Sequence, residues 1–199
     1  TLVLTDTLDD SIWAHLQAGK TVILNYHRDR KGNKYYWPGA FDRYKPCIWD
    51  RGSNLGGIIR TDWVRRAMGS ERYIEQNFYD LIEAGYKINL DHFPVAVEEI
   101  VNCVDKPVRD RMKGLIDKIK DFMPDDTLRN FCYLFSIKAG PGTLIVNTFN
   151  IKNLRRPAAA AFFTALIDHA AELKTEKSIA IPELKKYLRE TTAAGEIKE

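Results

Sequence analysis

The residues best suited to chemistry lie in a segment rich in aromatic side chains that runs from His27 to Gly57. Flat rings can stack on sugars. This segment supplies Tyr35, Tyr36, Trp37, Tyr44 and Trp49, and the predicted helix that follows at 61–67 adds Trp63. Carboxylate, guanidinium and amide groups next to Trp49 can exchange hydrogen bonds with hydroxyl groups. The candidate glycan-binding residues are therefore Trp37, Trp49, Asp50, Arg51, Asn54 and Trp63. The alternative is that the rings fasten the loop to a sheet, each burying about 150 to 250 Å².

Motifs of the common enzyme classes are missing from the sequence. There is no G-x-S-x-G elbow, no P-loop and no dinucleotide fingerprint. The four histidines stand alone, without the H-E-x-x-H spacing of a zinc site, at His15, His27, His92 and His169. We expect no cofactor and no bound metal, and we expect His169, which shares a helical face with Leu166 and Leu173, to lie at the edge of the core.

Three weaker patterns could still carry chemistry. Neighbouring carboxylates occur at Asp9-Asp10, Glu98-Glu99 and Asp125-Asp126, but adjacent residues project to different sides and do not form the facing pair of a glycosidase. The glycine-containing stretch from Arg51 to Gly57 could cradle an anion, although a plain turn is the more economical interpretation. An unrecognised pair, His27 with Asp50, is the alternative for a catalytic site.

Composition limits the class of protein. With 199 residues, 45% hydrophobic and 29% charged, the chain has the profile of one soluble globular domain. A net charge of +3 does not call for a nucleic-acid partner, and no apolar run approaches the roughly 20 residues of a membrane-spanning helix. We expect Cys47, Cys103 and Cys132 to be buried thiols. The start at Thr1, without methionine, suggests a piece of a longer protein.

Around these candidates, the apolar pattern predicts strands alternating with helices. Thr1 to Asp6 and Thr21 to Tyr26 are strand-like and flank a helix with apolar residues at Leu8, Ile12 and Leu16, which predicts two parallel strands joined by a right-handed crossover. Two later runs, 131–138 and 143–149, are separated by Ala139-Gly-Pro-Gly142 and predict an antiparallel hairpin.

The remaining elements are shorter or isolated. The pattern predicts strands at 57–60, 86–90 and 99–104, and helices at 61–67, 112–123, 157–173 and 182–190. Together these elements predict an α/β fold with a mostly parallel sheet, an antiparallel hairpin near the C-terminus and helices on both faces. We expect a single domain over residues 1–175, followed by a C-terminal helix and polar tail over 176–199.

Several short motifs occur in an order that resembles a known domain family. They are Leu16-Gln-Ala-Gly-Lys-Thr-Val-Ile-Leu24, Trp49 to Ile59 with its Asn54-Leu-Gly-Gly57, Asn77-Phe-Tyr-Asp80, Ile88-Asn-Leu-Asp91-His-Phe-Pro94, Gly142-Thr-Leu-Ile-Val146 and Arg156-Pro-Ala158. This order is similar to a C-terminal domain of bacterial family 2 type, β-galactosidase-like glycoside hydrolases. The sequence departs from that pattern at Ser53-Asn54 and Phe78-Tyr79, and in an apparent insertion that carries the Met112 to Met123 helix.

The resemblance implies a flavodoxin-like or class I glutamine-amidotransferase-like domain that lacks the amidotransferase nucleophile. It also implies that catalytic carboxylates lie on another domain, that the other domains of the parent hydrolase are its partners, and that the protein is exported to the periplasm or cell surface. We therefore expect a non-catalytic accessory domain that stabilises its parent or contacts a glycan. The alternatives are an amidotransferase-like or esterase-like hydrolase in its own right, and a ligand-free scaffold domain.

Overall fold

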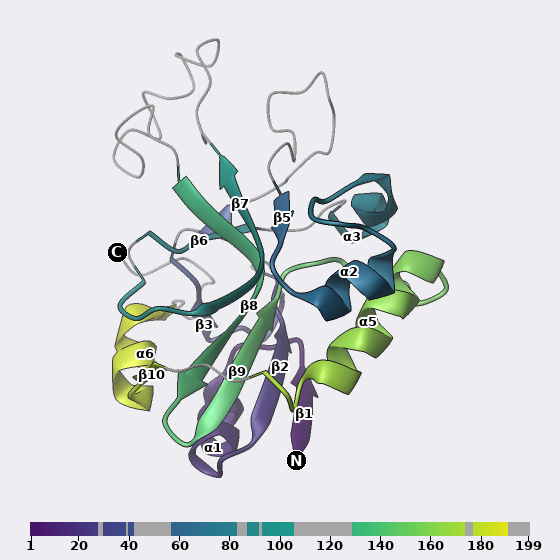
Figure 1. Ribbon diagram of the computed structural model, residues 1–199. Helices are drawn as coiled ribbons and strands as arrows, with labels where there is room; N and C mark the ends of the chain where they lie inside the picture. Colours follow the sequence, from purple (N-terminus) through teal and green to yellow (C-terminus); the bar gives the residue numbers. More distant parts are fainter. Residues whose placement is uncertain are drawn as a thin grey trace.

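The computed structural model describes residues 1–27, 30–38, 40–41, 57–82, 87–91, 93–105, 129–173 and 177–190. The first elements are β1 (Leu2–Thr5), α1 (Asp10–Gln17), β2 (Thr21–Asn25), β3 (Tyr35–Tyr36), β4 (Ala40–Phe41), β5 (Gly57–Ile59), α2 (Asp62–Met68), η1 (Gln76–Phe78), α3 (Tyr79–Ile82), β6 (Lys87–Asn89) and β7 (Glu98–Asp105). They are followed by β8 (Arg129–Ala139), β9 (Gly142–Asn147), α5 (Pro157–His169), β10 (Ser178–Ile179), α6 (Ile181–Tyr187) and β11 (Arg189–Glu190) (Figure 1).

The N-terminal strand, helix and strand form the predicted parallel unit. β1 pairs with β2 in parallel, from Leu2 opposite Thr21 to Thr5 opposite Leu24. The Asp9 carboxylate accepts the backbone N–H of Ser11 at 2.9 Å and so caps α1, which turns Ile12 and Leu16 into the core. The predicted pair of parallel strands joined by a helix is therefore confirmed.

The predicted hairpin is also confirmed and completes the centre of the sheet. β8 and β9 pair antiparallel as far as Ala139 opposite Gly142, with Gly140 at a φ of 56° in the two-residue turn between them. β9 then pairs in parallel with β2, from Thr21 opposite Thr143 to Asn25 opposite Asn147. The hairpin thus brings residues from late in the chain beside the N-terminal unit.

The resulting nine-stranded sheet is mixed. β1, β2 and β9 are parallel to one another, whereas β8 is antiparallel to β9, and β7 and β5 continue the antiparallel pairing. β6 pairs with β8 and β4 pairs with β6. β10 pairs with the last residues of β8. The α/β class is confirmed, and the parallel pairings are those among β1, β2 and β9 and the short pairing of β10 with β8.

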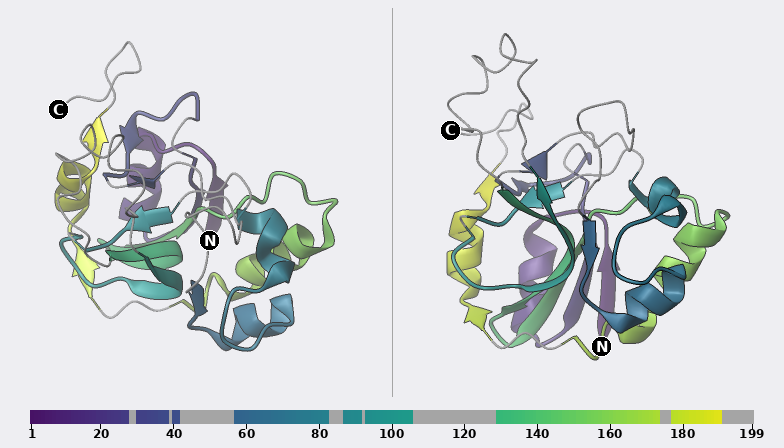
Figure 2. Two further views of the ribbon diagram at one scale, coloured as in Figure 1. Left: turned by 90° about the horizontal axis from the view of Figure 1, so that it is seen from above. Right: turned by 45° about the horizontal axis from the view of Figure 1, so that its top comes forward.

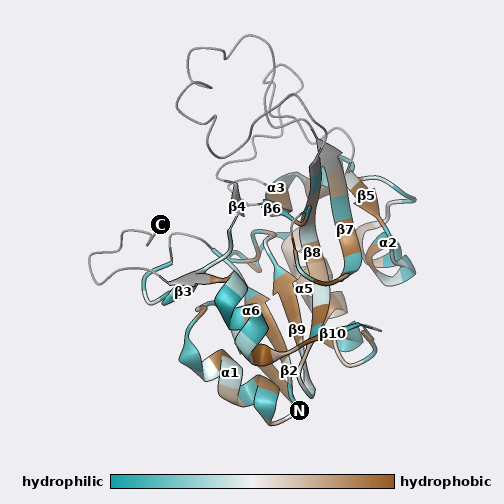
Figure 3. Cartoon of the chain, turned by 90° about the vertical axis from the view of Figure 1, so that its left-hand side faces the viewer, coloured by the Kyte–Doolittle hydropathy of each residue, from teal (hydrophilic) through white to brown (hydrophobic). Residues whose placement is uncertain are grey.

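Helices cover both faces of this sheet (Figure 2). On one face, α1 and α6 pack over a cluster that includes Val22 and Leu24 of β2. On the other, α2, α3 and α5 pack over a cluster that includes Ile23. Hydrophilic residues lie on the outer surfaces of α1 and α6, with hydrophobic strands beneath them (Figure 3). Successive side chains of β2 therefore enter opposite clusters, as expected for a strand that is buried on both faces.

The C-terminal segment belongs to this core. Ile181 and Leu184 of α6 are buried in the same cluster as α1, β10 pairs with β8, and β11 pairs antiparallel with β3. The sequence pattern treats residues 176–199 as an addition to the domain. In the structure, residues 177–190 instead pack on one face of the sheet as part of its hydrophobic core.

Most of the other predicted elements occur with shifted ends. β5, α2, β6, β7, α5 and α6 correspond to predicted strands and helices, and α5 begins at Pro157 as expected but ends at His169. The two-residue strands β3, β4, β10 and β11 were not predicted. The predicted helix over 112–123 and the tail after Glu190 lie outside the described residues. Among the helices that the structure describes, none has the length and apolar character needed to cross a membrane.

Candidate functional site at the carboxyl ends of β1 and β2

Trp37, the first candidate glycan-binding residue, is enclosed by other side chains. Its ring is 0% exposed and stacks on Phe93 at a centroid distance of 5.5 Å. It also makes T-shaped contacts with Phe135 and Tyr187, at centroid distances of 5.4 and 6.2 Å. The Trp37 backbone N–H donates to the Tyr26 hydroxyl at 3.0 Å. No ring face is left for a sugar, so Trp37 fastens the loop to the sheet, which was the alternative interpretation.

Trp63 is buried on the opposite face of the sheet. It is 8% exposed and stacks on the His169 ring, with centroids 5.4 Å apart, where α2 meets α5. His169 lies at the edge of the core, as predicted, and its Nδ1 is 2.7 Å from a Glu172 carboxylate oxygen. Because the sheet separates Trp63 from Trp37, these two rings do not form one site.

The remaining candidates are outside the described residues. Trp49, Asp50, Arg51 and Asn54 fall in 42–56, so their part in glycan binding stays a prediction, as does the pairing of His27 with Asp50. Two of the three predicted buried thiols, Cys103 and Cys132, are buried and form no disulfide, and Cys47 lies outside the described residues. Burial raises the pKa of the Cys132 thiol, which keeps that side chain protonated rather than nucleophilic.

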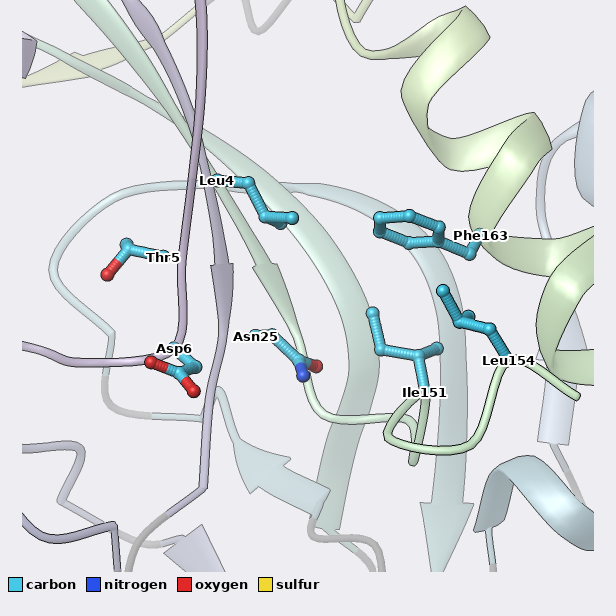
Figure 4. Close-up of a pocket in the computed structure, with 7 residues that line it drawn as sticks. All are labelled: Leu4, Thr5, Asp6, Asn25, Ile151, Leu154 and Phe163. Atoms are coloured by element: carbon cyan, nitrogen blue, oxygen red, sulfur yellow. The ribbon is translucent and has the colours of Figure 1, made fainter.

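A pocket of about 310 Å³ opens where β1 and β2 end (Figure 4). Its lining is Leu4, Thr5, Asp6, Asn25, Ile151, Leu154 and Phe163, and we call it the carboxyl-end pocket. These residues come from β1 and β2, from the segment between β9 and α5, and from α5 itself. Open α/β sheets bind ligands outside the carboxyl ends of their parallel strands, so this pocket lies at the expected place for a site.

One side of the carboxyl-end pocket is polar because of strand register. Thr5 lies opposite Leu24, so Asp6, which follows β1, and Asn25, the last residue of β2, come next along these two adjacent strands, and both line the pocket. The Asp6 carboxylate forms an ion pair with Arg30 and accepts the Thr7 hydroxyl at 3.3 Å. Arg30 therefore balances the charge of Asp6, while the carboxylate oxygens keep lone pairs for further donors.

The other side of the carboxyl-end pocket is apolar. Leu4 and Phe163 point toward one another across it, and Ile151 and Leu154 flank Phe163 (Figure 4). Leu4 and Leu154 are 52% and 47% exposed, so the apolar wall reaches solvent. A pocket with one hydrogen-bonding side and one apolar side suits a ligand whose two faces differ in the same way.

Sequence reasoning missed the residues of this pocket. In the sequence pattern, Asp6 and Asn25 belong only to strand-like runs, although both follow the apolar residues of predicted parallel strands. That position was the available signal, since the carboxyl ends of parallel strands share one edge of a sheet. Nothing in the sequence pairs Phe163 with Leu4.

The described residues contain no group of three or more His, Cys, Asp or Glu side chains gathered to hold a metal ion. No protein-family model matches the chain, and a comparison with curated proteins gives no significant match.

Proposed function

We propose that this chain is a non-catalytic accessory domain of a bacterial glycoside hydrolase of the β-galactosidase-like type, and that it contacts glycan through the carboxyl-end pocket. The observation that carries the glycan proposal is the division of that pocket into a polar side with Asp6 and Asn25 and an apolar side with Leu4 and Phe163. The hydrolase proposal rests on the resemblance of the sequence motifs. The catalytic carboxylates then belong to another domain of the parent.

The chemistry of the pocket matches that of a sugar ring. A pyranose carries hydroxyl groups around its rim that both donate and accept hydrogen bonds, and C–H groups on its flat faces. The Asp6 carboxylate can accept from a hydroxyl, the Asn25 amide can donate to one, and the Phe163 ring can lie against a C–H face. At about 310 Å³, the pocket is near the lower end of the roughly 300 to 1,000 Å³ typical of ligand sites, which suits one or two rings.

The finer fold assignment, the partners and the location belong to the same proposal. A flavodoxin-like or class I amidotransferase-like ancestry is supported by the parallel β1–α1–β2 unit and by helices on both faces of the sheet. Its partners are the other domains of the parent hydrolase, and its location is the periplasm or the cell surface.

Affinity electrophoresis against plant and host polysaccharides tests this function, with a glycosidase assay on the same samples. We expect retardation without turnover by the wild-type domain. Phe163→Ala should weaken the retardation several-fold because it removes the ring from the pocket wall. Tyr73→Ala removes an exposed ring beside β5, at the other end of the sheet, and should leave retardation unchanged.

Circular dichroism on each variant separates a lost contact from a lost fold. If no polysaccharide retards the folded wild-type domain, the glycan proposal is wrong. Turnover by the isolated domain would contradict its non-catalytic role. Equal loss of retardation in Phe163→Ala and Tyr73→Ala would show that the carboxyl-end pocket is not the binding site.

A second candidate, a scaffold domain that packs against its neighbours, is favoured by one observation. Leu2 and Leu4 of the edge strand β1 are 38% and 52% exposed, and Leu154 adds to the same side. Exposed apolar side chains gathered on a sheet edge are typical of a surface that another protein segment covers.

A further inference from the structure

A short chain of hydrogen bonds leads from the backbone into the carboxyl-end pocket. The backbone N–H of Phe149 donates to Oδ1 of Asn147 at 3.2 Å. Nδ2 of Asn147 donates to Oδ1 of Asn25 at 2.9 Å and to the Phe149 carbonyl at 3.2 Å. Asn25 is the last residue of β2 and lines the pocket.

The Phe149 backbone N–H fixes the orientation of the side-chain amides of Asn147 and Asn25. A backbone N–H can only donate, so the atom of Asn147 that faces Phe149 N must be the oxygen. The amino group of Asn147 is then left to donate, and Asn25 must present its own oxygen to it. Asn147 is completely buried, so no water competes for these bonds.

The consequence for the pocket is that Asn25 offers hydrogen-bond donors. Its oxygen is occupied by Asn147, and its amino group has no hydrogen-bond partner within the described residues. Beside it, the Asp6 carboxylate offers acceptor sites while its charge is balanced by Arg30. A donor and an acceptor therefore lie at the ends of two adjacent strands, and Arg30 offsets the charge of the acceptor.

We propose that Asn147 is a positioning residue that fixes Asn25 as a donor, so that the carboxyl-end pocket selects an uncharged ligand with neighbouring hydroxyl groups over a cationic amine. One hydroxyl accepts from the Asn25 amide and the next donates to Asp6. An ammonium group placed at Asn25 has only N–H donors and would meet the donors of the amide. This inference rests on the proposed glycan-binding function and names the kind of sugar that the same site takes.

Two probes of equal shape test the selection, methyl β-D-galactopyranoside and its 2-amino-2-deoxy counterpart, titrated by NMR in mildly acidic buffer where the amine is protonated. The wild-type domain should bind the neutral probe more tightly. Asn25→Asp keeps an oxygen for Asn147 but replaces the donor with a carboxylate oxygen, so the ratio of the two affinities should shift about tenfold toward the amino sugar, equivalent to about 1.4 kcal/mol. Asn89→Asp makes the same charge change at the end of β6 and should leave the ratio near that of wild type.

The role of Asn147 has its own readout. Asn147→Ala removes the donor that holds the Asn25 oxygen, so we expect the preference between the two probes to shrink even where the variant remains folded. In the wild type, the side-chain amide hydrogens of Asn147 should exchange with solvent much more slowly than those of Asn25. Faster exchange at Asn147 than at Asn25 would overturn the positioning role without reference to any ligand.

The outcomes separate this inference from the proposed function. Polysaccharide retardation together with a wild-type preference for the amino sugar, or with an unchanged ratio in Asn25→Asp, would overturn the inference and leave glycan binding intact. Failure of both probes to bind while polysaccharides still retard the domain would overturn the assigned ligand class. Absence of retardation as well would overturn the proposed function itself.

Discussion

Gly142 occupies a crowded backbone position at the start of β9. A Cβ atom there would lie 2.6 Å from the Leu16 carbonyl oxygen and 2.8 Å from the Lys20 carbonyl oxygen. Both obstacles are backbone atoms, one at the end of α1 and the other just before β2. The start of β9 can approach the N-terminal unit this closely because residue 142 has no side chain.

Gly142→Ala should therefore lower the stability of the domain. The added methyl group forces the start of β9 away from Leu16 and Lys20, and we expect a loss of about 1 to 3 kcal/mol, measured by thermal or urea unfolding. Gly57→Ala is the matched control, because the atoms nearest to its Cβ belong to the side chain of Ile74, which can move. An equal or larger loss in Gly57→Ala would show that the backbone approach at Gly142 is not the limiting contact.

The sequence carried a signal for some of the missed site residues, and for the packing of Trp37 it carried none, for a physical reason. Asp6 and Asn25 follow from predicted parallel strands, so their proximity was within reach. The burial of Trp37 was not, because its ring stacks on Phe93 and packs against Tyr187, which come from a distant irregular segment and from the end of α6. Periodicity reports which face of a regular element is buried, but a ring in an aperiodic loop carries no such signal.

Among the elements, α1, β3 and α6 are joined by one carboxylate. The Asp10 carboxylate of α1 accepts from Lys34 Nζ at 2.5 Å, from the Tyr35 hydroxyl at 2.6 Å and from Lys185 Nζ at 3.2 Å. Both ammonium groups also lie over the Tyr35 ring, at 5.5 and 5.3 Å from its centroid. Hydrogen bonds from Lys34, Tyr35 and Lys185 hold the pKa of the Asp10 carboxyl well below its ordinary value of 3.8.

Asp10→Asn should reduce stability in a manner that depends on pH. Because the folded-state pKa of Asp10 lies below its unfolded value, the stabilisation is fully present above about pH 4 and is lost as the pH falls further. We expect the Tm of Asp10→Asn to lie below that of wild type at neutral pH, and the gap to narrow on acidification below about pH 4. Asp62→Asn, which breaks an ion pair within α2, should change the Tm less. A gap between wild type and Asp10→Asn that stays constant down to strongly acidic pH would contradict this account.

Helices and strands with their own apolar periodicity, and turns with characteristic residues, were predictable. Short strands that exist only because they pair with a distant segment were not. Leu8, Ile12 and Leu16 mark α1, and Ala139 to Gly142 mark the hairpin. β3 and β11 are two residues each and exist because Tyr36 and Arg189 lie opposite one another across the fold. The place of α6 in the core was missed for the same reason. Its apolar residues are buried only because α1 and β8, which are far away in sequence, pack beside them.

For the molecule as a whole, β1 is an edge strand without the usual protection. Its sequence, Leu-Val-Leu-Thr, carries no charge, no proline and no bulge, and both leucines are exposed. Natural sheets commonly protect their edges with lysine, proline or bulges against pairing with another chain. This edge of the described sheet is therefore open to association with another strand.

Leu4→Lys should reduce association of the isolated domain at high concentration, because it places a charge at the centre of the open edge. Light scattering coupled to size exclusion chromatography measures the effect. Tyr73→Lys is the control, because it adds the same charge to an exposed hydrophobic residue beside β5, away from β1. If Leu4→Lys and wild type associate to the same extent, the β1 edge is not the contact.

The position of β2 in the sheet also has a consequence for how the chain folds. On one side β2 pairs with β1, a close neighbour in sequence, but on the other it pairs with β9, so that Asn25 and Asn147 bond across a separation of 122 residues. Contacts this distant in sequence slow folding, since a long loop must close before they form. During synthesis, Val22, Ile23 and Leu24 leave the ribosome long before β9 exists to cover their open side. The nascent chain must therefore carry an unfinished apolar strand, which makes this stage the one at which a chaperone would matter most.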